Sequence, residues 1–164
     1  HLTKATAKLS SHSWKKSTSI ARHNFATMHM TNSEKVLAFR RKMGLPVSTT
    51  PTLLSSEQAS YFARFIMEEL SEYLRACEEN SLVDAADALV DLVYVTMGCS
   101  HAMGLPFDQL FNVVHEANMN KEPANDYIRS LRGSQYDVIK PMGWQAPEAM
   151  MLAIIQTEQQ KAKP

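Results

Sequence analysis

The stretch "FIMEELSEYLRACEENSLVDAADALVDLVYV", residues 65–95, decides the fold class of this chain. Its apolar residues recur mainly at helical spacing rather than in alternation, which indicates helices and not strands. Ser55 followed by Gln58 resembles a capping box upstream of the stretch, and Ser81 with Asp84 forms a similar start signal inside it. The two helices that these signals predict span residues 55–80 and 81–103.

Three further helices are predicted outside this stretch, over residues 34–43, 106–120 and 147–160. Pro106 and Pro147 suit the first position of a helix, where no backbone N–H is needed. The polar segment 121–146 contains glycine and proline and is interpreted as a loop. Because no convincing alternating strand pair and no internal repeat is present, we predict an all-α fold, a helical bundle of about four to five helices.

The composition is that of one globular domain. A chain of 164 residues with 45% hydrophobic residues is long enough for one core and short for two. No apolar run approaches the ~18 residues that a membrane-spanning helix needs, so no membrane association is expected. Only two cysteines are present, Cys77 and Cys99, so we expect a reducing compartment, with both thiols buried.

The net charge of zero hides an asymmetry between the two ends of the chain. Residues 1–33 carry five Lys or Arg and no acid, whereas the rest carries 12 basic and all 17 acidic residues. We therefore predict a basic, Ser/Thr-rich extension over residues 1–29 and a helical domain over residues 30–164. The extension is either a transit peptide, which indicates a mitochondrion or another organelle, or a disordered or artificial tail of an intracellular, cytoplasmic protein. Nucleic-acid binding ranks third, since the basic residues are not interleaved with aromatic ones.

Acidic residues interrupt both central helices on one face each. At 100° per residue, Glu69 and Glu72 lie about 60° apart, and Asp87 and Asp91 about 40° apart. The second helix is otherwise apolar nearly all round, which predicts burial. A buried carboxylate must be protonated, paired with a cation or bound to a metal. Because no Lys or Arg lies between Arg75 and Lys121, we predict a metal site, with a polar subunit interface as the alternative.

The ligand types indicate which metal. An all-oxygen donor set without histidine at ligand spacing favours Mg²⁺, or Mn²⁺, over zinc. A di-iron bundle needs Glu-x-x-His pairs, which neither helix contains. Mg²⁺ held by a few carboxylates is the usual partner of substrate phosphates, so the residues point to chemistry on a polyphosphate.

Two motifs carry a resemblance to a known superfamily. "EELSE", residues 68–72, followed by "DALVDLVY", residues 87–94, resembles the signature of the all-α nucleoside triphosphate pyrophosphohydrolases. That superfamily includes MazG, dimeric dUTPase and phosphoribosyl-ATP pyrophosphohydrolase. Further stretches, among them "FRRKMGLP" and "VIKPMGWQAPE", resemble the subgroup called phosphoribosyl-ATP pyrophosphohydrolase-like or Cof-like. The resemblance covers roughly residues 30–152.

The resemblance implies an activity and a set of metal ligands. A nucleoside triphosphate or its deoxy form would be cleaved at the α-phosphate to a monophosphate and pyrophosphate, by a protein that assembles as a dimer or tetramer. The implied metal ligands are Glu69, Glu72, Asp87 and Asp91. Glu68 would be a further ligand or would orient the attacking water, and Glu68 or Glu69 would act as base. The signature has Glu where this chain has Ala88, so Asp87 replaces it and the metal count stays open.

The resemblance also implies phosphate-binding residues, namely Asn118, Lys121 and Lys140. Triphosphate cleavage needs cations on oxygens that the metal does not cover, which agrees with this role. The alternative for Lys121 is a helix end, where a cation interacts favourably with the helix dipole. Two rival functions remain: phosphoribosyl-ATP hydrolysis, and a catalytically silent assembly subunit.

Overall fold

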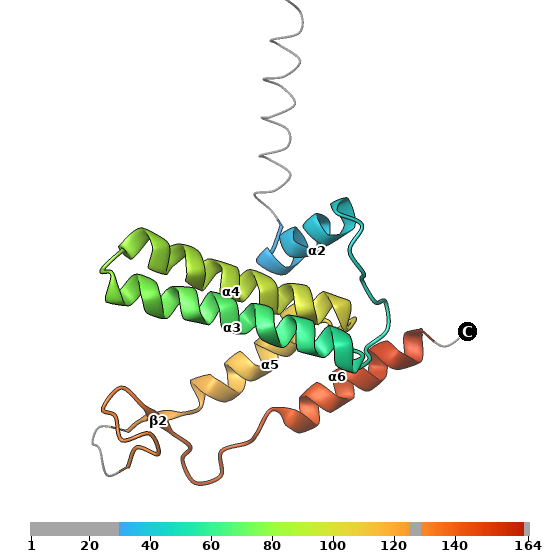
Figure 1. Cartoon of the computed structure of the whole chain (residues 1–164). Coiled ribbons are helices and arrows are strands. Elements are labelled where there is room, and N and C mark those ends of the chain that lie inside the picture. The colour runs from blue at the N-terminus through green and yellow to red at the C-terminus, as the bar shows by residue number, and fades with distance from the viewer. Residues whose placement is uncertain (1–29, 125–128, 163–164) are drawn as a thin grey trace, which may run out of the picture. The chain divides into compact units, whose positions relative to one another are not determined.

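The computed structural model of the protein describes residues 30–124 and 129–162. The chain divides into two compact units between residues 35 and 36, and every contact discussed below lies within the second unit. The extension predicted over residues 1–29 lies outside the described residues. The elements in chain order are α2 (Asn32–Lys42), α3 (Ser56–Glu78), α4 (Leu82–Ala102), α5 (Phe107–Met119), β1 (Glu122–Pro123), β2 (Val138–Ile139) and α6 (Glu148–Lys161) (Figure 1). The predicted all-α fold is confirmed.

Helices α3 and α4 form an antiparallel pair with the most extensive contact between any two elements described (Figure 1). The short connection reverses the chain at Asn80, whose φ of 55° is left-handed, and Ser81 then caps α4 by accepting a hydrogen bond from the Asp84 N–H. Small side chains at Ala76 and Ala88 are buried, 3% and 4% exposed. Alanine at these positions lets the two helix backbones approach closely near the turn.

A capping box starts α3, as the sequence predicts. The Ser55 hydroxyl accepts a hydrogen bond from the Gln58 N–H at 3.3 Å, and the Gln58 side chain accepts one from the Ser55 N–H at 3.3 Å. These two bonds satisfy backbone donors that the first turn of a helix leaves free. The helix ends at Glu78, two residues before the predicted end.

We expect Ser55→Ala to lower the free energy of unfolding by about 1 kcal/mol, because it removes the hydroxyl that caps α3. Urea denaturation followed by circular dichroism measures this change. Ser56→Ala is the matched control, since Ser56 is exposed and its hydroxyl caps nothing. Equal stability of the two variants would contradict the role given to the capping box.

The second half of the unit departs from the predicted loop. Residues 122–123 pair antiparallel with residues 138–139, so the segment interpreted as loop contains a short strand pair. Asp137 stabilises the adjoining turn by accepting hydrogen bonds from the Ser130 hydroxyl and from the Val138 N–H. These bonds, helped by Arg132, lower the Asp137 pKa to about 2. A two-residue pairing has no alternating pattern, which is why the sequence did not indicate it.

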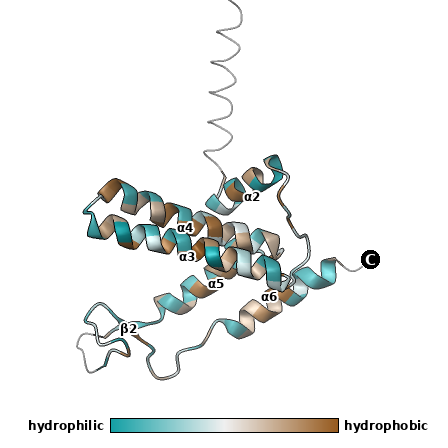
Figure 2. Ribbon diagram, viewed as in Figure 1, coloured by the Kyte–Doolittle hydropathy of each residue, from teal (hydrophilic) through white to brown (hydrophobic). Residues whose placement is uncertain are grey.

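Burial also differs from expectation. Cys99 is half-buried but Cys77 is exposed on α3, so the prediction of two buried thiols is wrong for Cys77. Apolar residues recur along α4 (Figure 2), and the described part of the chain leaves several of them exposed. The large apolar residues of α4 that remain exposed are Leu82, Val83, Leu89, Val90 and Val93. No helix in the described ranges is both long and apolar enough to span a membrane.

Candidate active site

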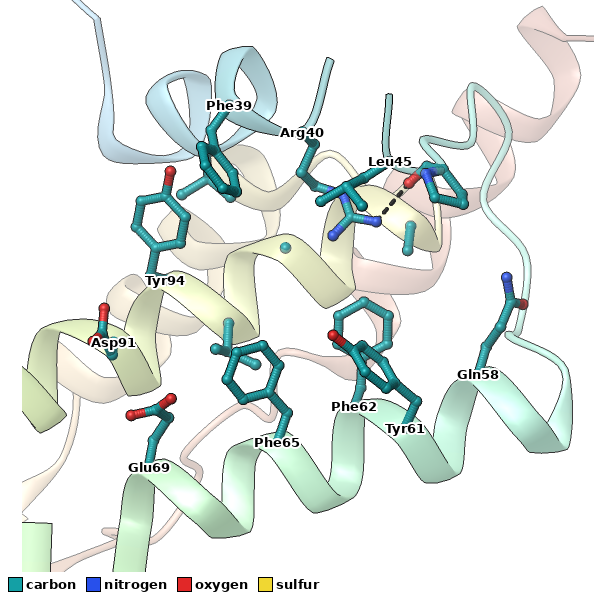
Figure 3. Close-up of a pocket in the computed structure, with 15 residues that line it drawn as sticks. Phe39, Arg40, Leu45, Gln58, Tyr61, Phe62, Phe65, Glu69, Asp91 and Tyr94 are labelled. Carbon is teal, nitrogen blue, oxygen red and sulfur yellow. Dashed lines mark hydrogen bonds between the residues drawn. The ribbon is translucent and has the colours of Figure 1, made fainter. Parts of the chain in front are cut away.

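A pocket of about 450 Å³ opens between α3, α4 and the later part of α2 (Figure 3). Most of its wall is aromatic or aliphatic. Two ring clusters line it: Phe39 meets Tyr94 edge-on with centroids 5.6 Å apart, and Tyr61 meets Phe65 at 6.0 Å. The first cluster belongs to α2 and α4, the second to α3. The pocket therefore offers flat apolar walls from three helices.

Two of the predicted acidic residues lie at one end of this pocket. Glu69 of α3 and Asp91 of α4 both line it, and the Glu69 side chain extends toward Asp91 (Figure 3). Glu69 is buried, 8% exposed, whereas Asp91 is exposed. The helix faces inferred from spacing thus bring one acid from each helix to a common site.

The electrostatics of Glu69 show how closely the acids gather. Burial is the largest cause that raises the Glu69 pKa. Repulsion from neighbouring carboxylates raises the pKa further, and its sources in decreasing size of effect are Asp91, Glu72, Glu68 and Asp87. No cation among the described residues contributes to this shift. Four other carboxylates therefore lie within electrostatic reach of buried Glu69, without a compensating positive charge from the described part of the chain.

Glu72 and Asp87 line a second, smaller depression of about 190 Å³ next to the α3–α4 turn. Arg75 lies there as well, with its Nη2 3.6 Å from Glu72 Oε1. The prediction excluded a cation only between Arg75 and Lys121 and did not consider Arg75 itself, which lies one helical turn after Glu72. Both side chains are about half exposed or more, so the pair contributes little to stability.

The chemistry of these carboxylate donors suits a hard divalent cation. All five side chains offer carboxylate oxygens, and the repulsion that raises the Glu69 pKa is what a bound cation would relieve. Within residues 30–124 and 129–162, however, no three His, Cys, Asp or Glu side chains are arranged as a metal site. Burial, on which the metal prediction rested, holds for Glu69 alone. Glu68, Glu72, Asp87 and Asp91 are exposed because the described chain does not cover this side of the helix pair.

Ala88, the departure from the signature, is buried in α4, while the neighbouring Asp87 is exposed and lines the smaller depression. The substitution of Asp87 for the signature Glu therefore moves the carboxylate from a buried position to the surface beside Glu72. The ligand roles of these residues stay predictions.

The predicted phosphate-binding residues gather elsewhere. Lys121 and Lys140 both lie over the Trp144 ring, with their Nζ atoms 5.6 and 4.4 Å from its centroid. The indole N–H donates to the Ala117 carbonyl at 2.7 Å and so fastens the segment after β2 to α5. Asn118 is exposed at the end of α5 and its carbonyl accepts the Lys121 N–H at 3.0 Å. None of the three predicted residues lines the pocket of Glu69 and Asp91.

Arg40, at the other end of the pocket, was missed by the sequence analysis. Its side chain is 8% exposed, its Nη2 donates to the Pro46 carbonyl at 2.6 Å, and its guanidinium lies 5.7 Å from the Phe62 ring centroid. Burial lowers the Arg40 pKa. The available signal was its position one helical turn after Val36, on the face that the helix buries.

A helix pair whose acids lie at one end of an aromatic pocket agrees with the resemblance to the all-α nucleoside triphosphate pyrophosphohydrolases. The family model described as phosphoribosyl-ATP pyrophosphohydrolase matches residues 36–118, about half of the chain. The chain belongs to this family. No curated protein matches the sequence. The matched residues include the five acids and Arg40 and end at Asn118, so Lys121 and Lys140 lie outside the match.

Proposed function

We propose that the protein is a Mg²⁺-dependent hydrolase that cleaves a nucleoside or deoxynucleoside triphosphate to a monophosphate and pyrophosphate. The observation that carries the proposal is the gathering of four carboxylates around buried Glu69, at the end of a pocket with aromatic walls. Aromatic walls suit a nucleobase, and an acidic end suits the metal that accompanies phosphates.

The proposed ligands of Mg²⁺, or of Mn²⁺ in its place, are Glu69, Glu72, Asp87 and Asp91. Bound metal would neutralise phosphate oxygens and lower the pKa of a bound water. Glu69 is better placed than Glu68 to receive the proton of the attacking water, because Glu69 lines the pocket. Glu68 is exposed in a neighbouring shallow hollow beside Tyr61 and Arg64, where it can hold a water in position.

We also propose that the protein works as a homo-oligomer, a dimer or a tetramer. The exposed apolar residues on α4, among them Leu89, Val90 and Val93, support this, since large apolar surfaces are normally covered. Phosphate binding by Asn118, Lys121 and Lys140 belongs to the same proposal. Their two ammonium groups on one indole ring form a concentrated positive charge that a polyphosphate would neutralise.

A second candidate is hydrolysis of phosphoribosyl-ATP, which the name of the matching family favours. A panel of nucleoside triphosphates, deoxynucleoside triphosphates and phosphoribosyl-ATP, incubated with Mg²⁺ or with a chelator, tests both candidates. We expect pyrophosphate and a monophosphate from a triphosphate, and only with metal. Turnover of phosphoribosyl-ATP alone would establish the second candidate. No metal-dependent product from any nucleotide would refute both and favour a catalytically silent subunit.

Magnesium should also stabilise the protein against heat. At a hundred-fold excess over its Kd, a ligand that binds only the folded state adds about 2.7 kcal/mol, which raises Tm by about 5 to 10 °C for a domain of this size. Thermal melts with Mg²⁺ and with chelator measure the shift. Glu78→Gln, which removes an exposed carboxylate outside both depressions, should retain it. An unchanged Tm in saturating Mg²⁺ would contradict the metal site.

A further inference from the structure

The pocket between α2, α3 and α4, called the main pocket below, carries opposite charges at its two ends. Glu69 and Asp91 provide negative charge at one end, and Arg40 and Gln58 line the other (Figure 3). Arg40 lies against Phe62, which precedes Glu69 on α3 by seven residues, a separation of about 10 Å along a helix. The two ends are thus separated by a length comparable to that between the α-phosphate of a nucleotide and the edge of its base remote from the sugar.

The guanidinium of Arg40 has unused hydrogen-bond donors. Its Nε has no hydrogen-bond partner but is buried, so a ligand does not reach it. Within the described residues the guanidinium makes a single hydrogen bond, from Nη2 to the Pro46 carbonyl, which leaves Nη1 as the donor open to a ligand. Among the described residues no Asp or Glu balances its charge, since the groups that act on it electrostatically are Cys99 and Tyr61. A buried cation with free N–H groups is costly unless an acceptor satisfies it.

The position of the guanidinium depends on its neighbours. Phe62 lies on one side, and Gly98 of α4 leaves room on another, because a Cβ at that position would lie 3.3 Å from Arg40 Nη1. The bond to Pro46 fixes the outer nitrogen. Arg40 is therefore held at the wall of a pocket whose ring clusters can stack on a flat ligand (Figure 3).

We propose that Arg40 recognises the nucleobase and selects bases that carry a carbonyl oxygen, rather than an amino group, on the edge remote from the sugar. Guanine, hypoxanthine, uracil and thymine carry such an oxygen, whereas adenine and cytosine carry an amino group. This inference rests on the proposed function and adds its substrate class. A guanidinium carries only hydrogen-bond donors, so it can bind a carbonyl oxygen. An amino group also presents donors, so no hydrogen bond forms between the two.

Two matched substrate pairs test this selection. UTP carries a carbonyl at position 4 where CTP carries an amino group, and ITP differs from ATP in the same way at position 6. In each pair the adjacent ring nitrogen also differs, because it carries a proton only in UTP and ITP. We expect kcat/KM to be about ten-fold or more higher for UTP than for CTP, and likewise for ITP over ATP, because a hydrogen bond to a charged group is made in one case and lost in the other. In Arg40→Met both ratios should fall to about one.

Controls separate base selection from folding. Arg41→Met removes an exposed arginine from the same helix and should keep both ratios. If Arg40→Met fails to fold, Arg40→Lys retains a charge and a donor for the Pro46 carbonyl but presents fewer donors to the base, and should reduce both ratios. A purely structural role for Arg40 would lower all four rates equally and leave the ratios unchanged, which would overturn the proposal.

Binding measurements distinguish failure of this inference from failure of the proposed function. The probes are the α,β-imido analogues of UTP and CTP, which resist hydrolysis at the α-phosphate, titrated in a calorimeter with wild type and Arg40→Met. Tighter binding of the uracil analogue that depends on Arg40 would support the inference even if no nucleotide is turned over. Equal binding of both analogues, a preference for cytosine, no binding, or a preference that persists in Arg40→Met would overturn it, whether or not hydrolysis occurs.

Discussion

Asp91→Asn should reduce kcat/KM for nucleotide hydrolysis by about a thousand-fold, because Asp91 is a proposed metal ligand and its loss would remove several kcal/mol of charge stabilisation in the transition state. Asp91 lines the pocket opposite Glu69 and is exposed, so the amide replaces the carboxylate without disturbing a packed core. Glu72→Gln should have a similar effect from the neighbouring depression. Steady-state kinetics in Mg²⁺, with circular dichroism as the check on helical content, measure both variants.

Glu78→Gln is the matched control for these two substitutions. Glu78 is an exposed glutamate at the end of α3, and it lines neither the main pocket nor the depression of Glu72 and Asp87. The variant should retain wild-type activity. Near-normal turnover by both Asp91→Asn and Glu72→Gln would refute the assignment of metal ligands.

Glu69→Gln should abolish activity and yet make the metal-free protein more stable at neutral pH. The folded-state pKa of Glu69 is raised above its ordinary value of 4.5, by burial first and then by the neighbouring acids. Folding is therefore favoured while this carboxyl is protonated, and that contribution is lost as the pH rises from 4.5 through the raised pKa. Glutamine cannot ionise, so the variant keeps the contribution at neutral pH.

Thermal melts in chelator across this pH range measure the effect. Wild type should lose Tm relative to Glu69→Gln as the pH rises, and the two curves should converge below the ordinary pKa of a glutamate. Glu68→Gln, at an exposed neighbouring position, should follow wild type more closely. A Glu69→Gln variant that melts at or below wild type at neutral pH, without metal, would contradict the unfavourable burial of this carboxylate.

Local signals predicted the helices well. The start of α3 follows from Ser55 and Gln58, whose mutual hydrogen bonds lie within four residues of sequence. Ser81 likewise starts α4. The shared faces of Glu69 with Glu72 and of Asp87 with Asp91 follow from helical geometry alone. Predictions that depend on contacts within one turn were therefore reliable.

Predictions that depend on distant contacts were less reliable. Burial of α4 was inferred from its apolar composition, yet exposure depends on which elements or subunits cover each face, and that information is not local. In the sequence Arg40 is one of two adjacent arginines. That Arg40 is buried while Arg41 is exposed depends on Phe62 and Gly98, which lie more than 20 positions away. The pairing of residues 122–123 with 138–139 was missed for the same reason.

Because residue 98 is glycine, Arg40 has room beside α4, and this position can affect how the pocket evolves. A single methyl group at position 98 would press on the guanidinium, while the carboxylates around Glu69 lie at the opposite end of the pocket. On the roles proposed for Arg40 and Glu69, base preference and bond cleavage are encoded by separate residues. A lineage could exchange one nucleotide for another by one small substitution while its hydrolytic chemistry stays intact, so substrate choice can drift faster than reaction type.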